Sequence, residues 1–289
     1  MALLVVLCAS WGIQQVAIKV AIPGVSPLFQ SGIRSIGATL IVLTWMNVRR
    51  EPVLEKDGTL WWGVAVGLLF AAEFILIYWG LEFTHASRGI IFLYLSPFVV
   101  ALGAQIFIPG EHLTRIQVVG LCCAFMGIVI AFSESFGYPT RQMLIGDSML
   151  TGAAVLWGAT TVMIKASPLV RIRPAKTLLY QVAVSAVVLP IASLIKNEPG
   201  IIMITPLIAG SLIYQTVWVA SITYLIWFWL VRNYPPSRLA SFTFLAPLLG
   251  VIAGGLLLNE PITSRLIFAL FFVGAGIYLV NRPFNGKNV

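Results

Sequence analysis

Charged residues are scarce in this sequence. Only 10% of the 289 residues are Asp, Glu, Lys or Arg, whereas soluble domains contain about 25%. In addition, 59% of the residues are hydrophobic and the mean hydropathy is +0.96. This composition excludes an ordinary soluble domain and indicates a protein that lies in a lipid bilayer.

Acids are the rarer sign of charge, because 10 Asp and Glu face 18 Lys and Arg and the net charge is +8. A nucleic-acid partner would need these bases gathered in a patch or stripe. They lie scattered, mostly in short connectors between apolar runs. We therefore expect no nucleic-acid partner.

Cysteine and histidine are nearly absent. Cys8, Cys122 and Cys123 lie within apolar runs, without the spacing of a metal site or a disulfide framework, and His85 and His112 lie in connectors. No P-loop or G-x-G-x-x-G segment occurs, so we expect no metal, no cofactor and no ATP-driven transport. A membrane enzyme is a weak alternative, since it would need paired carboxylates or a histidine cluster.

Long apolar runs fill most of the chain, and ten of them approach the roughly 20 residues that a spanning helix requires. They cover about 2–20, 27–47, 60–83, 87–107, 115–133, 146–166, 174–194, 206–230, 237–258 and 265–281. The runs are continuous rather than alternating, which excludes a β-barrel. The first run lacks the basic region of a signal peptide, so we interpret it as a span.

The basic residues predict the orientation of these spans. Four lie on one side: Arg88, Arg141, Lys196 and Arg265. Eleven lie on the other: Arg49, Arg50, Lys56, Arg115, Arg171, Arg173, Lys176, Arg232, Arg238, Arg282 and Lys287. We therefore expect both termini in the cytoplasm, in a multi-pass protein of the cell inner membrane.

The second half of the sequence repeats the first. The matched pairs, at offsets of 146 to 150, are Trp11 with Trp157, Lys19 with Lys165, Pro97 with Pro247, and Glu111 with Glu260. We predict an all-α membrane protein whose ten helices form two five-helix units, 1–140 and 141–289. Because five is odd, the second unit is inverted relative to the first. Inverted repeats favour alternating access to a midplane site, although a purely structural duplication is an alternative.

These paired blocks resemble the EamA branch of the drug/metabolite transporter superfamily. The shared pattern is a Trp-Gly pair in the first span, a proline in the fourth span followed by Glu and "LT" or "IT", and a Gly-rich fifth span. The resemblance covers essentially the whole chain and extends to the bacterial aromatic amino acid exporters. It implies two inverted five-helix bundles, a central cavity and efflux of small metabolites. Arg34 aligns with Gln181, so a role of Arg34 would not be repeated.

Two charged side chains, Arg34 and Glu73, are expected inside the membrane. An ionised group at the bilayer centre costs roughly 2.5–3.5 kcal/mol on insertion scales, so such residues usually face a cavity or a partner. Glu73 is a candidate for binding a substrate ammonium or a proton, and Arg34 for binding a carboxylate. Together they match a zwitterionic amino acid, but they could equally neutralise each other or serve structural roles.

Polar groups follow a tryptophan at matching positions of the two units. Gln14 and Gln15 follow Trp11, and Thr160 and Thr161 follow Trp157. Polar groups that deep must be satisfied by one another, by water or by ligand. We expect both segments to line a cavity.

Four further aromatic residues are candidates for a cavity wall: Tyr78, Trp79, Tyr214 and Trp218. The first two follow Glu73, and the last two lie four residues apart on the counterpart span. Ordinary packing between helices is the alternative for all four.

Lys19 and Lys165 lie at the ends of their spans, where they either snorkel to the interface or attract an anionic group in the cavity.

Pro97 and Pro247 should interrupt their spans and act as gates or as static kinks. Three acids, Glu111, Glu260 and Asp147, are expected to cap helices.

These features predict a secondary transporter that exports amino acids, aromatic or other apolar ones, and related small metabolites. The alternatives are a drug/metabolite or nucleotide-sugar carrier of the same fold and, less favoured, a channel. The expected partners are a small-molecule substrate and the lipid bilayer, with a monomer as the simplest state.

Overall fold

The computed structural model describes residues 1–289 except 54, 56, 136–137, 259–263 and 283–289. Within these residues the chain is helical, and its extended pairing is a single bridge between Val25 and Ile201. The helices are α1 (Ala2–Ala21), α2 (Pro27–Val48), α3 (Leu60–Phe83), α4 (Ala86–Leu93), α5 (Ser96–Phe107), α6 (Arg115–Ala131), η1 (Ser133–Ser135), α7 (Arg141–Ala166), η2 (Pro168–Arg171), α8 (Pro174–Ile195), α9 (Pro206–Ile213), η3 (Tyr214–Thr223), α10 (Tyr224–Asn233), α11 (Pro236–Thr243), α12 (Leu245–Leu258) and α13 (Arg265–Asn281).

Seven helical stretches of the described chain are long and apolar enough to cross a membrane. They are Ala2–Ala21, Leu60–Phe83, Arg88–Phe107, Arg141–Ala166, Pro174–Ile195, Pro206–Asn233 and Pro236–Leu257. Helices α6 and α13 are apolar but shorter. Helix α2 has 22 residues but carries Gln30, Arg34 and several hydroxyl groups, and it is not among the seven. The chain is therefore a multi-pass helical membrane protein, and the count of ten spans stays a prediction.

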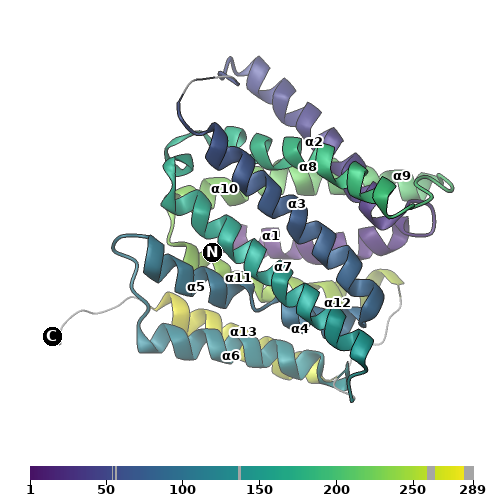
Figure 1. The fold of residues 1–289 in the computed structure, drawn as a ribbon. Helices are drawn as coiled ribbons and strands as arrows, with labels where there is room; N and C mark the ends of the chain where they lie inside the picture. Colours follow the sequence, from purple (N-terminus) through teal and green to yellow (C-terminus); the bar gives the residue numbers. More distant parts are fainter. Residues whose placement is uncertain (54, 56, 136–137, 259–263, 283–289) are drawn as a thin grey trace.

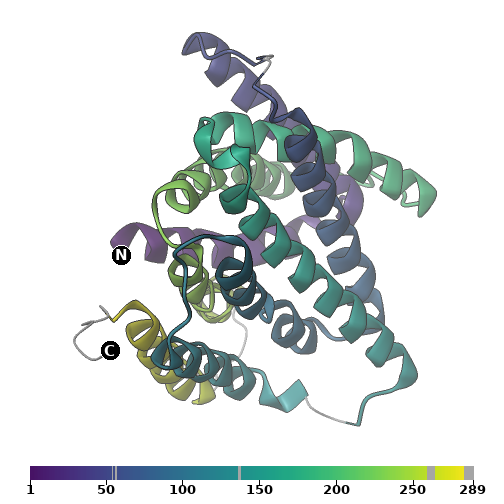
Figure 2. The same ribbon diagram turned by 60° about the vertical axis from the view of Figure 1, so that its left-hand side comes forward.

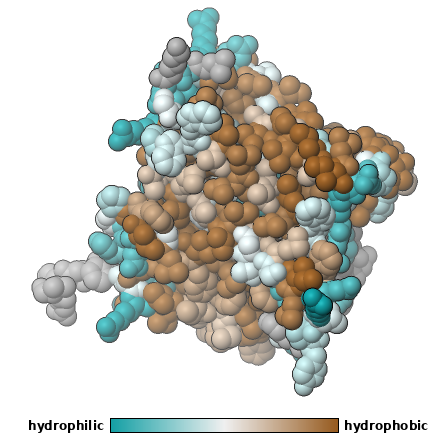
Figure 3. Space-filling view, in the orientation of Figure 1, coloured by the Kyte–Doolittle hydropathy of each residue, from teal (hydrophilic) through white to brown (hydrophobic). Residues whose placement is uncertain are grey.

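The molecule has two polar ends separated by an apolar band. The start of α1 and the end of α13 lie at one end, which we call the terminal end (Figures 1 and 2). The connectors 22–26, 84–85 and 196–205 lie at the opposite end, which we call the far end. Hydrophilic residues gather at both ends and hydrophobic residues cover the middle (Figure 3), as expected for a bilayer-spanning protein.

Helices from the two halves of the chain pack against each other. The pairs α6 with α13, α2 with α8, and α1 with α12 all join segments far apart in sequence. One close approach is between α1 and α12, where a Cβ atom on Gly12 would lie 2.6 Å from the backbone nitrogen of Gly250. Small residues allow such contact in membrane bundles. Gly12 would therefore tolerate no larger side chain without a shift of the helices.

Two helical stretches are broken at matching places. The chain leaves the helix at Tyr94 and Leu95, between α4 and α5, and at Phe244, between α11 and α12. The predicted breaks are present, but each lies before the proline rather than at it. Pro97 and Pro247 occupy the first turn of the helix that follows, where a missing N–H breaks no helical bond.

The predicted capping roles of the acids need correction. Helix α6 is capped by Thr114, which forms a capping box with Gln117, while Glu111 accepts a 3.4 Å hydrogen bond from Ser237. Helix α7 begins at Arg141, five residues earlier than expected, and its cap is Thr140. Asp147 therefore lies inside the helix and pairs with Arg88 at 2.7 Å. Glu260 lies outside the described residues.

At the far end, the connectors that flank α2 and α8 are joined through Glu198. Its carboxylate accepts from the backbone nitrogens of Leu28 and Phe29, at 3.3 and 3.0 Å, and so caps the first turn of α2. Glu51 holds the matching place in the first unit, at the offset of 147 that also relates Pro27 to Pro174. Glu51 instead pairs with Arg173 at 2.8 Å, and its Oε2 atom is buried without a partner.

At the terminal end, the connector 49–59 is held to the start of α8 by an ion pair. Lys176 Nζ lies 2.6 Å from the Asp57 carboxylate, which also accepts a hydrogen bond from the Thr59 hydroxyl. The Lys176 contact is the main cause that lowers the pKa of Asp57 to about 2. This connector is therefore tied down across the ordinary range of pH.

Candidate functional site

A cavity of about 410 Å³ lies between α1, α3, α4, α7, α8, α10 and α12. On most of these helices the lining residues come from the part nearer the far end, such as Phe70 to Leu81 on α3. Phe132, beyond the last residue of α6, lines it at that end. The cavity therefore extends from the middle of the molecule toward the far end.

Aromatic rings form a floor between the cavity and the terminal end. Trp11 packs edge-on against Trp227 with ring centroids 5.4 Å apart, and Tyr94 packs against Trp157 at 5.8 Å. Behind them, Phe244 lies 6.3 Å from Tyr94. Edge-to-face contacts of this kind stabilise a closed aromatic layer. The floor separates the cavity from the terminal end.

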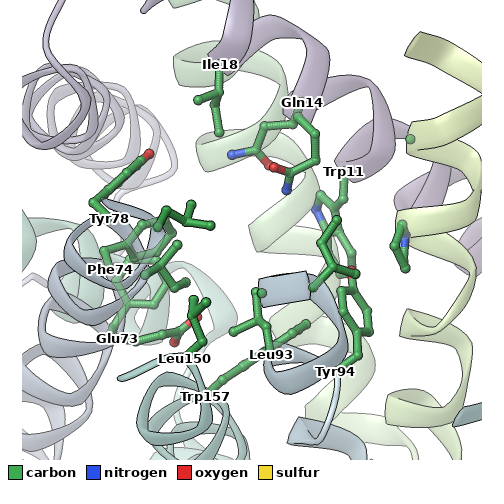
Figure 4. Close-up of a pocket in the computed structure, with 18 of the residues that line it drawn as sticks. Trp11, Gln14, Ile18, Glu73, Phe74, Tyr78, Leu93, Tyr94, Leu150 and Trp157 are labelled. Carbon is green, nitrogen blue, oxygen red and sulfur yellow. The ribbon is translucent and has the colours of Figure 1, made fainter. Parts of the chain in front are cut away.

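Glu73 is the acidic residue that lines this cavity in the described chain. It lies on α3, on the same wall as Phe74 and Tyr78, across the cavity from Trp11 and Gln14 (Figure 4). The side chain is 6% exposed, and its Oε2 atom has no hydrogen-bond partner. An unpaired carboxylate at this depth needs a cation, a proton or water to satisfy it.

Arg34 lies behind the cavity wall rather than on it. Its guanidinium group stacks on the Phe74 ring at 4.5 Å from the centroid and donates one hydrogen bond to Ser31 at 3.2 Å. The residue is 1% exposed, and its Nε and Nη1 atoms have no partner. Arg34 lies close enough to Glu73 for their charges to interact, but the two form neither an ion pair nor a hydrogen bond. The alternative in which they neutralise each other by direct contact is therefore not what the structure contains.

The paired segments of α1 and α7 both line the cavity. The lining residues among them are Trp11, Gln14, Gln15, Trp157, Thr160 and Thr161, joined by Lys19 near the far end. The two threonine hydroxyls donate to carbonyls of their own helix, which leaves their oxygens able to accept from a ligand. The cavity thus combines amide and hydroxyl groups with aromatic rings.

Several predicted residues lie elsewhere. Tyr214 and Trp218 share a face, but they donate to Ser10 on α1, at 3.0 and 2.9 Å, instead of lining the cavity. Trp79 lies on the outer surface of α3, and Lys165 donates to the Arg232 carbonyl at 2.8 Å. Of the two predicted gating prolines, Pro247 lines the cavity and Pro97 is buried away from it.

Other lining residues were not foreseen. They include Phe74, Tyr94, Tyr224, Trp227 and Gln181. Only Gln181 carried a signal, because it aligns with Arg34 in the repeat. The aromatic ones lie in spans so rich in Phe, Tyr and Trp that sequence spacing does not separate cavity walls from packing.

Comparisons with known proteins agree with this architecture. The sequence profile of the EamA-like transporter family matches residues 1–133 and 144–282. A relative from Bacillus subtilis (strain 168), named uncharacterized transporter YvbV, is 27% identical over 96% of this chain and 90% of its own length. Two relatives named probable amino-acid metabolite efflux pump are similar at comparable levels. The one from Escherichia coli K12 is 26% identical over 96% of this chain and 93% of its own, and the one from Salmonella typhimurium LT2 is 27% identical over 96% and 93%.

One solved crystal structure has the same fold. It matches with a TM-score of 0.80 over 96% of this chain and 94% of that chain, at 14% sequence identity. At this identity the likeness concerns the fold alone.

Proposed function

The chain belongs to the EamA-like transporter family, and we propose that it is a secondary transporter that exports amino acids or related small metabolites by alternating access. The observation that carries the proposal is the cavity itself. It encloses about 410 Å³, within the range of small-molecule sites, and pairs aromatic rings with one unpartnered carboxylate. Such a site suits a molecule with an ammonium group and a compact apolar side chain.

Repeated packing supports the two inverted units. If α7 corresponds to α1 and α12 to α5, the contact of α1 with α12 matches that of α7 with α5. The contact of α3 with α7 likewise matches that of α9 and η3 with α1, while α2 pairs with α8 and α6 with α13. The two stretches matched by the family profile also have nearly the boundaries of the two proposed units. Two such units can exchange conformations and so open the cavity to either side.

The state described here has its cavity toward the far end and its aromatic floor toward the terminal end. With both termini in the cytoplasm of a bacterial inner membrane, the far end faces outward, and this is the state that releases substrate. The second state would open the floor and close the helices around Phe132 and Leu81. A monomer suffices for this cycle, because the cavity lies within one chain.

The name shared by two relatives, probable amino-acid metabolite efflux pump, supports the substrate class. A drug/metabolite or nucleotide-sugar carrier of the same fold is the main alternative. A nucleotide sugar would need several bases in the cavity, and Lys19 is the only Lys or Arg that lines it in the described chain. An ammonium-binding carboxylate favours the amino-acid class.

Counterflow in proteoliposomes tests the proposal. Vesicles loaded with one unlabelled amino acid should take up a trace of the labelled form transiently and saturably, and competition by the twenty amino acids should rank the substrates. Ion current proportional to the driving force, without counterflow, would instead identify a channel. Exchange of nucleotide sugars but of no amino acid would overturn the substrate class and leave the carrier mechanism standing.

A further inference from the structure

Unpaired polar atoms are concentrated in one interface of this protein. Nine buried side-chain nitrogen and oxygen atoms of the described residues have no hydrogen-bond partner. All but one belong to five residues of α2, α3 and α8, namely Gln30, Arg34, Glu73, Gln181 and Ser185. The exception is Glu51 Oε2 at the terminal end. We call Gln30, Arg34, Gln181 and Ser185 the α2–α8 polar stripe.

Helix packing brings the stripe together. Helices α2 and α8 are antiparallel, since the Leu28 amide reaches Glu198 while a Cβ atom on Gly32 would meet Pro190. Gln30 and Arg34 lie one turn apart on α2, and Gln181 and Ser185 one turn apart on α8. Helix α3 runs along α8, where Gly67 faces Val184. The stripe therefore lies between α2, α3 and α8 and reaches the cavity at Gln181. Arg34 lies behind Phe74, which forms part of the cavity wall.

Leaving these polar groups without hydrogen-bond partners destabilises the folded protein. Each unsatisfied buried polar group costs about 1–3 kcal/mol, and a charged one costs more. Gln30 and Ser185 are 0% exposed, and Arg34 and Gln181 are 1% exposed. Within the bilayer no surrounding water can form hydrogen bonds with these groups. A site with so many free donors and acceptors is suited to a polar ligand.

The charge of the stripe selects the ligand. Arg34 offers the N–H groups of its Nε and Nη1 atoms, and the amides and the hydroxyl can donate as well, whereas the acids that lie near the stripe, Glu73 and Glu198, bond to none of them. A cation is repelled by Arg34, so the fitting ligand is a small anion. Because the Phe74 ring covers the face of the guanidinium group, the donors that lie in its plane stay available for a carboxylate.

We propose that Arg34, with Gln30 one turn away, forms the carboxylate subsite of the transported molecule. This inference rests on the proposed function, in which Glu73 binds the ammonium group. The substrate then places its ammonium group at Glu73 and its carboxylate at Arg34. Phe74 covers Arg34 in this state, so the ring has to move aside before the carboxylate binds. The substrate class is thereby narrowed to zwitterionic amino acids, and simple amines and simple acids are poor substrates.

Matched analogues test the subsite in proteoliposomes. Each amino acid that competes in counterflow is compared with its amide, which keeps the ammonium group and loses the carboxylate. For the native protein we expect the acid to compete about ten- to a hundredfold better than the amide, as one charged hydrogen bond implies. Arg34→Gln should bring this ratio close to one while the amide still competes. Arg34→Lys keeps the charge without the planar fork and should give an intermediate ratio.

Controls keep the outcomes distinct. Ser35→Ala, on the same helix, removes a hydroxyl that bonds only to the Ser31 carbonyl and should leave the ratio unchanged. Should Arg34→Gln fail to fold, Gln30→Leu is measured in its place and should lower the ratio of acid to amide competition severalfold. Acid and amide competing alike in the native protein, or a ratio that survives Arg34→Gln, would overturn the subsite but leave the proposed function intact. Competition by no amino acid at all would overturn the proposed function and the subsite with it.

A free anion is the other source of the same chemistry. The assays are therefore repeated with sulfate in place of chloride. A ratio that does not depend on chloride supports the substrate carboxylate. Transport that requires chloride in the native protein but not in Arg34→Gln would assign the subsite to chloride and overturn the carboxylate.

Discussion

The first unit carries Arg34 and Glu73 at positions where the second unit carries Gln181 and Thr223. The helices around these positions pack in the same pairs in both units. The duplicated architecture is therefore shared, while the charged chemistry belongs to one unit alone. In the proposed transport cycle, the repeat provides the two alternative conformations and the charged residues of the first unit recognise the substrate.

One hydrogen bond sharpens the contrast. Trp11 donates from its indole nitrogen to the Thr223 hydroxyl at 3.0 Å and so joins α1 to η3. The matching pair is Trp157 and Glu73, both on the cavity wall, and no hydrogen bond joins them. The second unit uses this position to hold two helices together, whereas in the first unit both residues line the cavity.

The largest expected effect concerns the ion pair between Arg88 and Asp147, which joins the two proposed units and is not repeated at Arg238. Both side chains are under 8% exposed, and Arg238, which matches Arg88, forms no ion pair in the described chain. Asp147→Asn should destabilise the protein by about 3–5 kcal/mol, because it removes one partner of a buried ion pair. Thermal unfolding in detergent measures the loss, with Arg238→Gln as the matched control. Equal melting temperatures for the two variants would contradict this contrast.

Glu73→Gln should lower amino-acid counterflow about ten- to a hundredfold, the cost of one hydrogen bond to a charged group. Thr223→Val at the matching position should lower it less than about threefold. Glu82→Gln provides the control on the same helix, since Glu82 lies outside the cavity and pairs with Lys196. Full retention of pH-dependent uptake by Glu73→Gln would remove Glu73 from any proton role. Equal losses of counterflow for the variants at positions 73 and 223 would mean instead that the substrate contacts both units alike.

Glu198 and Glu51 offer a smaller contrast at the two ends. Glu198→Ala should destabilise the protein by about 1–2 kcal/mol because it uncaps α2. Glu51→Ala should cost less, since Glu51 caps no helix and its partner Arg173 is well exposed. The order of the two melting temperatures checks this contrast. The reverse order would mean that Glu51, rather than Glu198, holds the α2–α8 pair.

The smallest expected effect is that of mild acid on the terminal end. A lowered pKa means that the Asp57 contact stabilises the folded state above the ordinary Asp pKa of about 4 and is lost only as pH falls toward about 2. Between pH 5 and 8 a single cysteine introduced in the connector, at Val53, should therefore keep one accessibility to a thiol reagent, measured relative to a free thiol at the same pH. Asp57→Asn should raise that accessibility at every pH. A change between pH 5 and 8 in the native protein would indicate another titrating group.

Sequence reasoning predicted most helices because each apolar run ends at a proline, glycine or charged cluster. It placed the start of α7 too late, since the first two turns, "RQMLIGD", are helical but only partly apolar. It also predicted no π-helix. The wider turns of η3 accompany hydrogen bonds from Tyr214 and Trp218 to Ser10, and such tertiary contacts leave no trace in local spacing.

The cavity was partly predictable for a similar reason. Polar residues deep in a span must find partners, which correctly directed attention to Gln14, Thr160 and Glu73. Sequence spacing does not reveal which of two buried faces a residue takes. Arg34 therefore lies behind Phe74 rather than on the cavity wall, a position that depends on how α2 packs against α3 and α8.

Accessibility of Gln15→Cys is the most direct test of alternating access. Gln15 lines the cavity and is exposed, and replacing Cys8, Cys122 and Cys123 leaves the new thiol as the only one. A membrane-impermeant reagent should modify it from the outside of oriented vesicles and not from the inside, and saturating internal amino acid should shift the balance between the two. Modification from both sides at once, or equal modification with and without substrate, would contradict a cavity that faces one side at a time.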